Sequence, residues 1–161
     1  MNELPRIGLG IDVHRLGPGR ACILAGIRFD SPVGPVGHSD GDAVLHAACD
    51  AVLGAAGLDD LGSLFSDRDP NNKGRASAEF CAATMALVRE RKLRVISMDV
   101  VVETETPRLK PHRQAMRDRL ASLFGLPADR VNVKGKTGEG VDAIGRGEAV
   151  RATVVALLGP A

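Results

Sequence analysis

Three side chains in the sequence have the types and the spacing of a metal site. Asp12 and His14 are two residues apart in a segment that alternates like a β-strand, so both side chains leave the same face. His46 lies in an alanine-rich segment of helical periodicity, with Asp42 and Asp50 four residues to either side on the same expected face. Two imidazoles and a carboxylate suit Zn²⁺, and three protein ligands leave the fourth tetrahedral position for a substrate. Spacing alone leaves open that His46 is a hydrogen-bonded core histidine and that no metal binds.

Polar residues at the start of the same helical segment form a second candidate site. His38 and Ser39 precede the helix, where backbone N–H groups and the helix dipole can hold an anion such as phosphate. Ordinary capping is the competing interpretation, with Ser39 or Asp40 as the expected N-cap.

A glycine-rich segment, GKTGEGVDAIGRG from Gly135 to Gly147, is the third candidate. It resembles the end of a Walker A loop, but Arg130 stands where that motif needs a glycine, so a P-loop is rejected. Its lysine, threonine and exposed amides still suit a phosphate, and a hairpin connection with solvated charges is the alternative. No serine lies in a G-x-S-x-G elbow and no cysteine looks activated. Phosphate chemistry here would therefore depend on metals, cations and positioning.

The composition is that of a globular protein and excludes several classes of partner. The 161 residues, 44% hydrophobic and 25% charged, are expected to form one domain spanning residues 1–161. A net charge of +1 and the absence of Trp and Tyr argue against nucleic acid or an anionic membrane as partner. Cys22, Cys49 and Cys81 lie far apart and outside any CxxC pattern, so we expect buried thiols. No signal peptide or long apolar run is visible, which predicts a cytoplasmic protein.

The elements that must position these residues follow an α+β pattern. Strands are expected at residues 6–14, 22–24, 27–29, 94–104, 131–134 and 148–158, and helices at 41–57, 75–92 (with Ser77 as a possible cap) and 112–124. A polar loop without periodicity spans residues 58–73. One strand–helix–strand crossover near the end predicts a mixed sheet with helices packed on one face. Few residues remain to cover the other face, so a second subunit is its expected cover.

An ordered set of short motifs runs along nearly the whole chain. The motifs are GIDVH (10–14), GHSDGD (37–42), LH (45–46), DLG (60–62), LFSD (64–67), DP (69–70), KPH (110–112), VNVK (131–134) and GRGE (145–148). The set resembles the 2-C-methyl-D-erythritol 2,4-cyclodiphosphate synthase family of the non-mevalonate isoprenoid pathway.

The resemblance implies an enzyme that acts on 4-diphosphocytidyl-2-C-methyl-D-erythritol 2-phosphate. The 2-phosphate would attack the β-phosphorus, release CMP and leave 2-C-methyl-D-erythritol 2,4-cyclodiphosphate, which makes the enzyme a phosphorus–oxygen lyase. The resemblance also implies a homotrimer, with the open sheet faces packed around its axis and the active sites between neighbouring subunits.

The resemblance also implies roles for individual residues. Asp12, His14 and His46 would bind Zn²⁺, and Glu139 would bind a second ion, Mg²⁺ or Mn²⁺, between the α- and β-phosphates. His38 and Thr137 match residues assigned to transition-state stabilisation. Residues 60–62 and Asp67 match contacts to the erythritol portion, and residues 104–110 and 134–137 match the cytidine pocket. Together the expected substrate contacts are Asp12, His14, His38, Ser39, Asp60, Leu61, Gly62, Asp67, Thr104, Glu105, Thr106, Pro107, Arg108, Leu109, Lys110, Lys134, Gly135, Lys136, Thr137, Gly138, Glu139 and Arg146.

Two other functions are compatible with the same residues. One is a zinc-dependent phosphohydrolase that acts on a cytidine diphosphate conjugate, with Asp42 or Asp50 as the base that activates water. The other is a non-catalytic trimeric binding module with a structural zinc, although three ligands without cysteine are unusual for a structural site. Two places depart from the family pattern. By the resemblance, Gly135 would lie beside the cytosine of the substrate, and residues 141–143 would lie at the cavity along the trimer axis.

Overall fold

A mixed five-stranded sheet organises the computed structural model, which describes residues 4–37, 39–66, 69–72 and 74–161. The strand order is β4-β1-β7-β5-β6, with β4 at Val33–Pro35, β1 at Arg6–Pro18, β7 at Ala149–Pro160, β5 at Leu93–Glu103 and β6 at Val131–Lys136. Strand β7 is antiparallel to both of its neighbours, whereas β5 and β6 are parallel. The predicted mixed sheet and its single crossover are confirmed.

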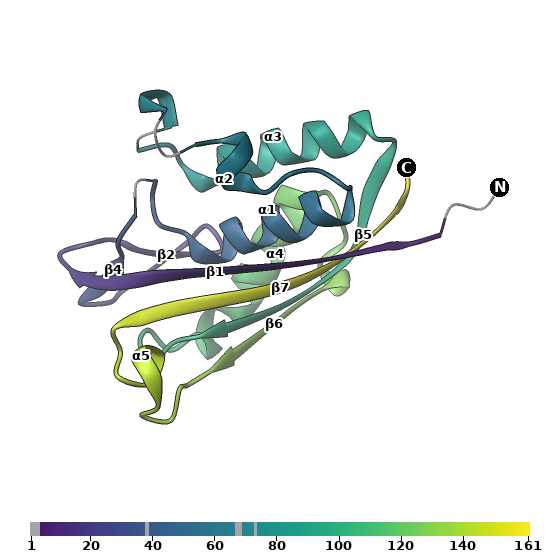
Figure 1. Cartoon of the computed structure of the whole chain (residues 1–161). Helices are drawn as coiled ribbons and strands as arrows, with labels where there is room; N and C mark the ends of the chain where they lie inside the picture. Colours follow the sequence, from purple (N-terminus) through teal and green to yellow (C-terminus); the bar gives the residue numbers. More distant parts are fainter. Residues whose placement is uncertain (1–3, 38, 67–68, 73) are drawn as a thin grey trace.

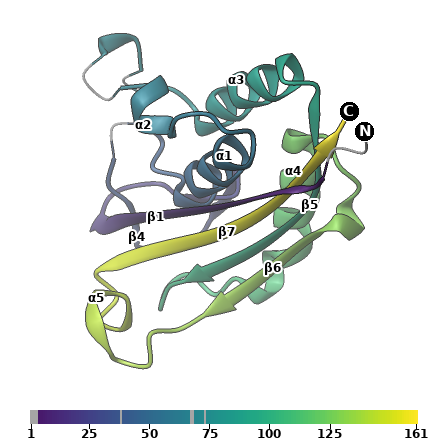
Figure 2. The same cartoon turned by 45° about the vertical axis from the view of Figure 1, so that its right-hand side comes forward.

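Three helices cover one face of the sheet, as Figures 1 and 2 show. They are α1 (Ala43–Ala55), α3 (Ser77–Glu90) and α4 (Arg113–Phe124), the last of which connects β5 to β6. A hairpin of β2 (Cys22–Leu24) and β3 (Ile27–Phe29) packs beside α1 and α4. The remaining elements are α2 (Leu61–Leu64), α5 (Asp142–Gly145) and 3₁₀ turns at Pro70–Asn72, Lys110–His112 and Ala128–Arg130. Within the described ranges, no helix is long and apolar enough to cross a membrane.

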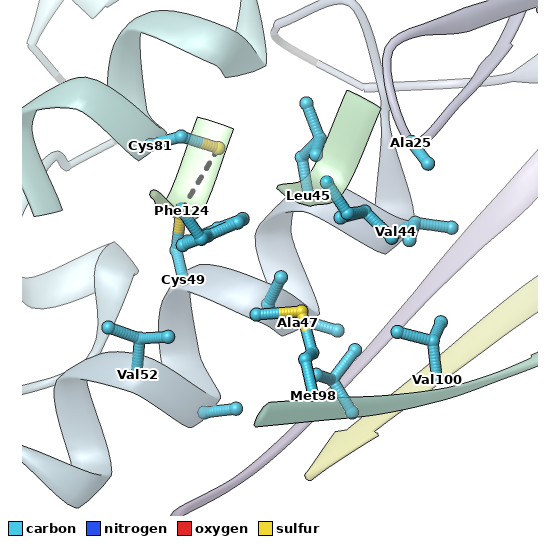
Figure 3. Packing of buried hydrophobic residues seen from close by; sticks show 14 of the residues in the cluster. Ala25, Val44, Leu45, Ala47, Cys49, Val52, Cys81, Met98, Val100 and Phe124 are labelled. Carbon is cyan, nitrogen blue, oxygen red and sulfur yellow. Dashed lines mark hydrogen bonds between the residues drawn. The ribbon is translucent and has the colours of Figure 1, made fainter. Parts of the chain in front are cut away.

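Helix α1 is the centre of the hydrophobic core. Figure 3 shows its side chains among Met98 and Val100 of β5 and Phe124 of α4. The Sγ atoms of Cys49 on α1 and Cys81 on α3 are 3.7 Å apart. All three cysteines are free and buried, as predicted.

Two glycines allow α1 to lie directly on the backbone of β1. A Cβ atom at Gly8 would lie 1.9 Å from the carbonyl oxygen of Ala51, and one at Gly10 would lie 1.9 Å from that of Ala47. Only glycine permits this separation, because any side chain would overlap the helix backbone. This close packing of α1 on β1 also sets how far His46 of α1 lies from Asp12 and His14, which follow Gly10 on the same face of β1.

The opposite face of β1 is apolar and exposed. Ile7, Leu9, Ile11 and Val13 keep between 53% and 73% of their surface exposed. On the neighbouring strand β7, Val155 is paired with Leu9 and is 41% exposed, so the exposed apolar surface extends onto β7. This is the face for which the sequence predicts a subunit as cover.

The N-terminus of α1 differs from the prediction. Asp42 is the N-cap, not Ser39 or Asp40, and its carboxylate accepts the N–H groups of Val44 and Leu45. The same carboxylate also accepts the N–H groups of Ala25 and Gly26 in the β2–β3 turn, at 2.9 and 2.6 Å. Asp42 is therefore buried in the core rather than placed on the face of His46, which corrects the expected alignment.

Several short elements were also missed. Strand β4 lies where no strand was predicted, between the hairpin and the first helix, and α2 and a 3₁₀ turn interrupt the predicted 58–73 loop. Ser77 does not cap α3: the N-cap position is Ala76, and Ser77 is the first helical residue. β4 and α2 are too short to show hydrophobic periodicity, and unlike the predicted hairpin of β2 and β3 they do not flank a recognisable turn.

Candidate functional site

The middle of β1 and the first turn of α1 bring the three predicted metal ligands together. One ligand atom each from Asp12, His14 and His46 lies within 4.8 Å of the others. Oδ2 of Asp12 is 2.9 Å from Nδ1 of His14 and 3.2 Å from Nδ1 of His46. The imidazole rings are 5.3 Å apart. The spacing-based prediction that these side chains share one site is confirmed.

The polar atoms of this cluster suit a cation. Nδ1 of His14 is buried and, among the described residues, has no hydrogen-bond partner, because its short contact with Asp12 lacks hydrogen-bond geometry. Burial opposes ionisation of Asp12, but the two neighbouring imidazoles outweigh burial and hold its pKa well below the ordinary value. Together with His46, this nitrogen and the ionised carboxylate form a group of side chains that could hold a metal ion.

The cluster opens into a pocket of about 380 Å³. Ser39, Leu61 and Gly62 line it, as the resemblance predicts for substrate contacts. Its walls also include Phe65 and Phe80, whose rings lie 5.3 Å apart.

The two acids flanking His46 have different surroundings. Burial raises the pKa of Asp42 to about 6, despite the backbone N–H groups that it accepts. Asp42 is completely buried and faces away from the pocket. Asp50 lines the pocket, accepts the N–H of Leu61 at 2.7 Å, and has a pKa raised by burial. Of the two bases considered for a hydrolase, only Asp50 reaches the pocket.

A second pocket, of about 280 Å³, lies at the ends of β5 and β6. Its lining contains most of the residues that the resemblance assigns to cytidine: Thr104, Glu105, Pro107, Arg108, Leu109, Lys110, Gly135, Lys136 and Thr137. The chain turns here through a cis peptide bond between Thr106 and Pro107. The Thr104 N–H donates to the carbonyl of Lys136 at 2.9 Å, which joins the two lining segments.

The glycine-rich segment closes one side of this pocket. Glu105 accepts the N–H of Gly138 at 2.6 Å, and the hydroxyl of Thr137 donates to Glu139 at 3.0 Å. A Cβ at Gly138 would lie 2.4 Å from the backbone nitrogen of Gly145, so the segment folds tightly upon itself. Thr137 and Glu139 are thus adjacent and exposed beside the nucleotide-sized pocket.

Some predicted contacts lie outside both pockets. Lys134 pairs with Asp99 at 2.6 Å, and Arg146 pairs with Glu148 at 3.0 Å. The Asp60 carboxylate caps α2 by accepting the Ser63 N–H. His38 and Asp67 lie outside the described residues.

Sequence reasoning missed Arg113 as a pocket residue. It lines the second pocket from the first turn of α4, and its Nε donates to the carbonyl of Val133 at 3.0 Å. With Arg108, Lys110 and Lys136 it makes the pocket strongly cationic. Its position directly after the KPH motif was the available signal.

Both pockets lie at the same end of the sheet but share no residue. Val13 of β1 pairs with Arg151 of β7, which in turn pairs with Glu103 at the end of β5. Strand β7 therefore separates β1, which carries Asp12 and His14, from β5, whose end lies at the second pocket, by two strand spacings, roughly 10 Å.

Comparison with known proteins finds one family. The model of the YgbB family matches residues 5–159. A curated 2-C-methyl-D-erythritol 2,4-cyclodiphosphate synthase from Gemmatimonas aurantiaca is 45% identical over 161 residues, covering 98% of this chain and 97% of that protein. A curated protein of the same name from Thermosynechococcus vestitus is 46% identical over 153 residues, covering 95% of each.

Solved structures agree with this result. A structure described as the CDP-bound form of 2C-methyl-D-erythritol-2,4-cyclodiphosphate synthase matches with a TM-score of 0.88 and 44% identity, covering 95% of this chain and 99% of that one. The bifunctional IspDF from Campylobacter jejuni matches with a TM-score of 0.94 and 37% identity. That match covers 98% of this chain but 43% of the longer chain.

Proposed function

The chain belongs to the YgbB family, and from this membership we propose that it cyclises 4-diphosphocytidyl-2-C-methyl-D-erythritol 2-phosphate. The products are 2-C-methyl-D-erythritol 2,4-cyclodiphosphate and CMP, so the enzyme is a phosphorus–oxygen lyase. The observation that carries the proposal is the Asp12, His14 and His46 cluster at the same sheet end as a cationic, nucleotide-sized pocket. The names of the curated relatives and the CDP-bound relative support it.

The reaction needs no protein nucleophile. An oxygen of the 2-phosphate bonds to the β-phosphorus, and the bond from that phosphorus to the bridging oxygen of the CMP phosphate breaks. The attacking phosphate is already ionised at neutral pH, because its second pKa is roughly 6. The protein therefore has to hold two anionic groups together and offset their charge.

The second pocket would hold the CMP portion. The base would lie against the segments that line this pocket around Thr104 and Gly135, and Arg108, Lys110 and Arg113 would supply positive charge for the phosphate. Cations at that position stabilise the leaving group as its negative charge grows. Thr137 donates its hydroxyl to Glu139 in the free protein, and would turn it to a phosphate oxygen once Glu139 holds the metal ion, in the role that the resemblance implies.

Asp12, His14 and His46 would hold Zn²⁺, which fits the buried His14 nitrogen, unpartnered in the part of the chain that the structure describes, and the ionised carboxylate of Asp12. When bound, the ion polarises a phosphate oxygen and offsets charge in the transition state. Glu139 would hold Mg²⁺ or Mn²⁺ together with the diphosphate. Its exposed carboxylate next to Thr137 leaves oxygen atoms free for such an ion.

The assembly we propose is a homotrimer with each active site between two subunits. The exposed row of Ile7, Leu9, Ile11 and Val13 supplies an apolar contact surface for the axis. The two pockets of one chain have no lining residue in common, which fits an active site in which one subunit supplies one pocket and its neighbour the other. We further propose that residues 1–161 act as one domain, and a cytoplasmic location stays a prediction.

The hydrolase remains the competing function because Asp50 lies in the metal-ligand pocket with a raised pKa. Phosphorus NMR on the purified protein with the proposed substrate, Mg²⁺ and trace Zn²⁺ separates the two reactions. We expect the coupled signals of a cyclic diphosphate together with CMP. CMP accompanied by an acyclic bisphosphate would identify water as the nucleophile, and the hydrolase would replace the cyclase.

Replacing His46 tests whether the metal cluster is catalytic. We expect His46→Ala to abolish CMP release while the protein stays folded, since the aliphatic core around α1 does not depend on the cluster. Circular dichroism and sedimentation provide the control for folding and assembly. Loss of folding at ordinary temperature would instead assign the cluster a structural role.

A further inference from the structure

The ring of His46 has two different sides. Nδ1 faces Asp12 in the metal-ligand cluster, while Nε2 faces away from it toward two serine hydroxyls. Nε2 lies 3.0 Å from Oγ of Ser77 and 3.2 Å from Oγ of Ser39. Ser77 is completely buried as the first residue of α3, so the closer partner is also the one shielded from water.

Asp40 determines which way the Ser77 hydroxyl points. Its carboxylate accepts the Ser77 hydroxyl at Oδ1 and the Ser77 N–H at Oδ2, the latter at 3.0 Å. Asp40 also accepts the N–H of Asp42 at 3.2 Å. Three donors converge on this side chain, which therefore acts as an acceptor. It also supplies the cap that Ala76, the N-cap residue of α3, cannot provide.

Because the Ser77 hydroxyl has only one proton, it determines which ring nitrogen of His46 carries a proton. A serine hydroxyl carries one proton, and that of Ser77 is donated to Asp40. Ser77 Oγ can therefore only accept a hydrogen bond from His46, which requires a proton on Nε2. With Nε2 protonated in the neutral ring, the lone pair is on Nδ1, on the side of Asp12 and His14.

We propose that Asp40 and Ser77 are positioning residues that hold His46 in its Nε2–H form and offer Nδ1 to the metal ion. The chain of hydrogen bonds runs from His46 through Ser77 to Asp40 and links α1, α3 and the loop before α1. Histidine ligands of metals commonly donate their second N–H to an acceptor, and losing that acceptor weakens metal binding. This inference rests on the metal site of the proposed function and adds the residues that orient it.

Zinc affinity measures the effect directly. Metal-free protein is titrated with Zn²⁺ in competition with a chromophoric chelator, without substrate. We expect Ser77→Ala to weaken zinc binding by about 10- to 100-fold. The matched control is Thr84→Val, because Thr84 is buried on the same helix and its hydroxyl has no hydrogen-bond partner among the described residues. Thr84→Val should bind zinc like the unchanged protein.

A second readout separates orientation from general stability. In zinc-loaded protein with ¹⁵N-labelled histidine, the Nε2–H of His46 should exchange slowly with water, since Ser77 accepts it. We expect at least a tenfold faster exchange in Ser77→Ala and no change in Thr84→Val. If Ser77→Ala does not fold, Asp40→Asn carries the same two measurements, because it removes a carboxylate acceptor and keeps Ser77.

The outcomes distinguish this inference from the proposed function. Unchanged zinc affinity and unchanged Nε2–H exchange in the variants would overturn the positioning role and leave the cyclase proposal intact. Weaker zinc binding in Ser77→Ala, in a protein that does not cyclise the substrate, would support the positioning role and remove the cyclase. An unchanged protein that binds no zinc would overturn both the metal site and the residues proposed to orient it.

Discussion

The two faces of strand β1 have opposite roles. One face carries Gly8 and Gly10 against the backbone of α1 and continues directly into Asp12 and His14. The other face carries four large aliphatic side chains that remain more than half exposed in the single chain. The glycine face is therefore packed against α1, whereas the face with the large aliphatic side chains is exposed. The comparison teaches that close backbone packing positions the candidate metal ligands, while the bulky residues are available for association.

The largest effect is expected on the packed face. Gly10→Ala places a Cβ 1.9 Å from the carbonyl oxygen of Ala47, and backbone atoms cannot move aside as a flexible side chain would. We expect a loss of roughly 3 kcal/mol or more in the free energy of unfolding, from the forced displacement of α1. Urea unfolding measures it. A variant as stable as the unchanged protein would mean that α1 and β1 are not in backbone contact.

The second-largest effect is expected at Asp12, which follows Gly10 on the packed face of β1. Asp12→Asn keeps the shape of the side chain but removes the charge between two imidazoles. We expect zinc affinity to fall and kcat/KM to drop by about a hundredfold or more, with folding preserved. Asp129→Asn, an exposed carboxylate in the 3₁₀ turn before β6, is the matched control. Equal activity of the two variants would remove Asp12 from the site.

The open face should respond in assembly rather than in folding. Ile11→Asp places a charge on a side chain that is 54% exposed in the isolated chain, so the fold tolerates it. In the proposed trimer the same charge would be buried near two copies of itself, which strongly disfavours association. Sedimentation should report a single chain for Ile11→Asp and a trimer for the control Ile11→Val. An unchanged protein that sediments as a single chain would refute the role given to this face.

The smallest effect uses a glycine that lacks close neighbours. Gly54 lies within α1, and a Cβ built there meets no atom of the described residues within 4 Å. Gly54→Ala should therefore stabilise the protein by up to about 1 kcal/mol, through the higher helix propensity of alanine. Thermal unfolding measures it, and destabilisation would show that the exposed side of α1 is more crowded than it is in the structure.

The chemistry of the site could be predicted because it is local in sequence. Asp12 and His14 share a face through strand alternation, and their types suit a metal wherever the strand lies. The long elements could also be predicted, since the strand at 94–104 and the helix at 112–124 carry strong local signals. The short strands at 22–24 and 27–29 could be predicted because Gly26 marks the turn between them, whereas β4 and α2 have no such local signal.

Capping shows where local reasoning ends. Ser39, Asp40 and Asp42 are all good N-cap types, and no property of the sequence ranks them. Asp42 caps α1 because it also receives the N–H groups of Ala25 and Gly26 from a distant turn. Asp40 instead caps α3, 37 residues away. Each choice depends on a contact that exists only after the chain has folded.

By itself the sequence determined which three residues could hold a metal ion, the mixed sheet and the apolar, exposed face of β1. These follow from residue type and from the periodicity of neighbouring residues, which the chain carries before it folds. Only the tertiary structure decided how closely α1 lies on β1, which acid caps which helix, and which nitrogen of His46 faces Asp12. The physical reason is that backbone separation and hydrogen-bond direction depend on atoms from elements far apart in the chain.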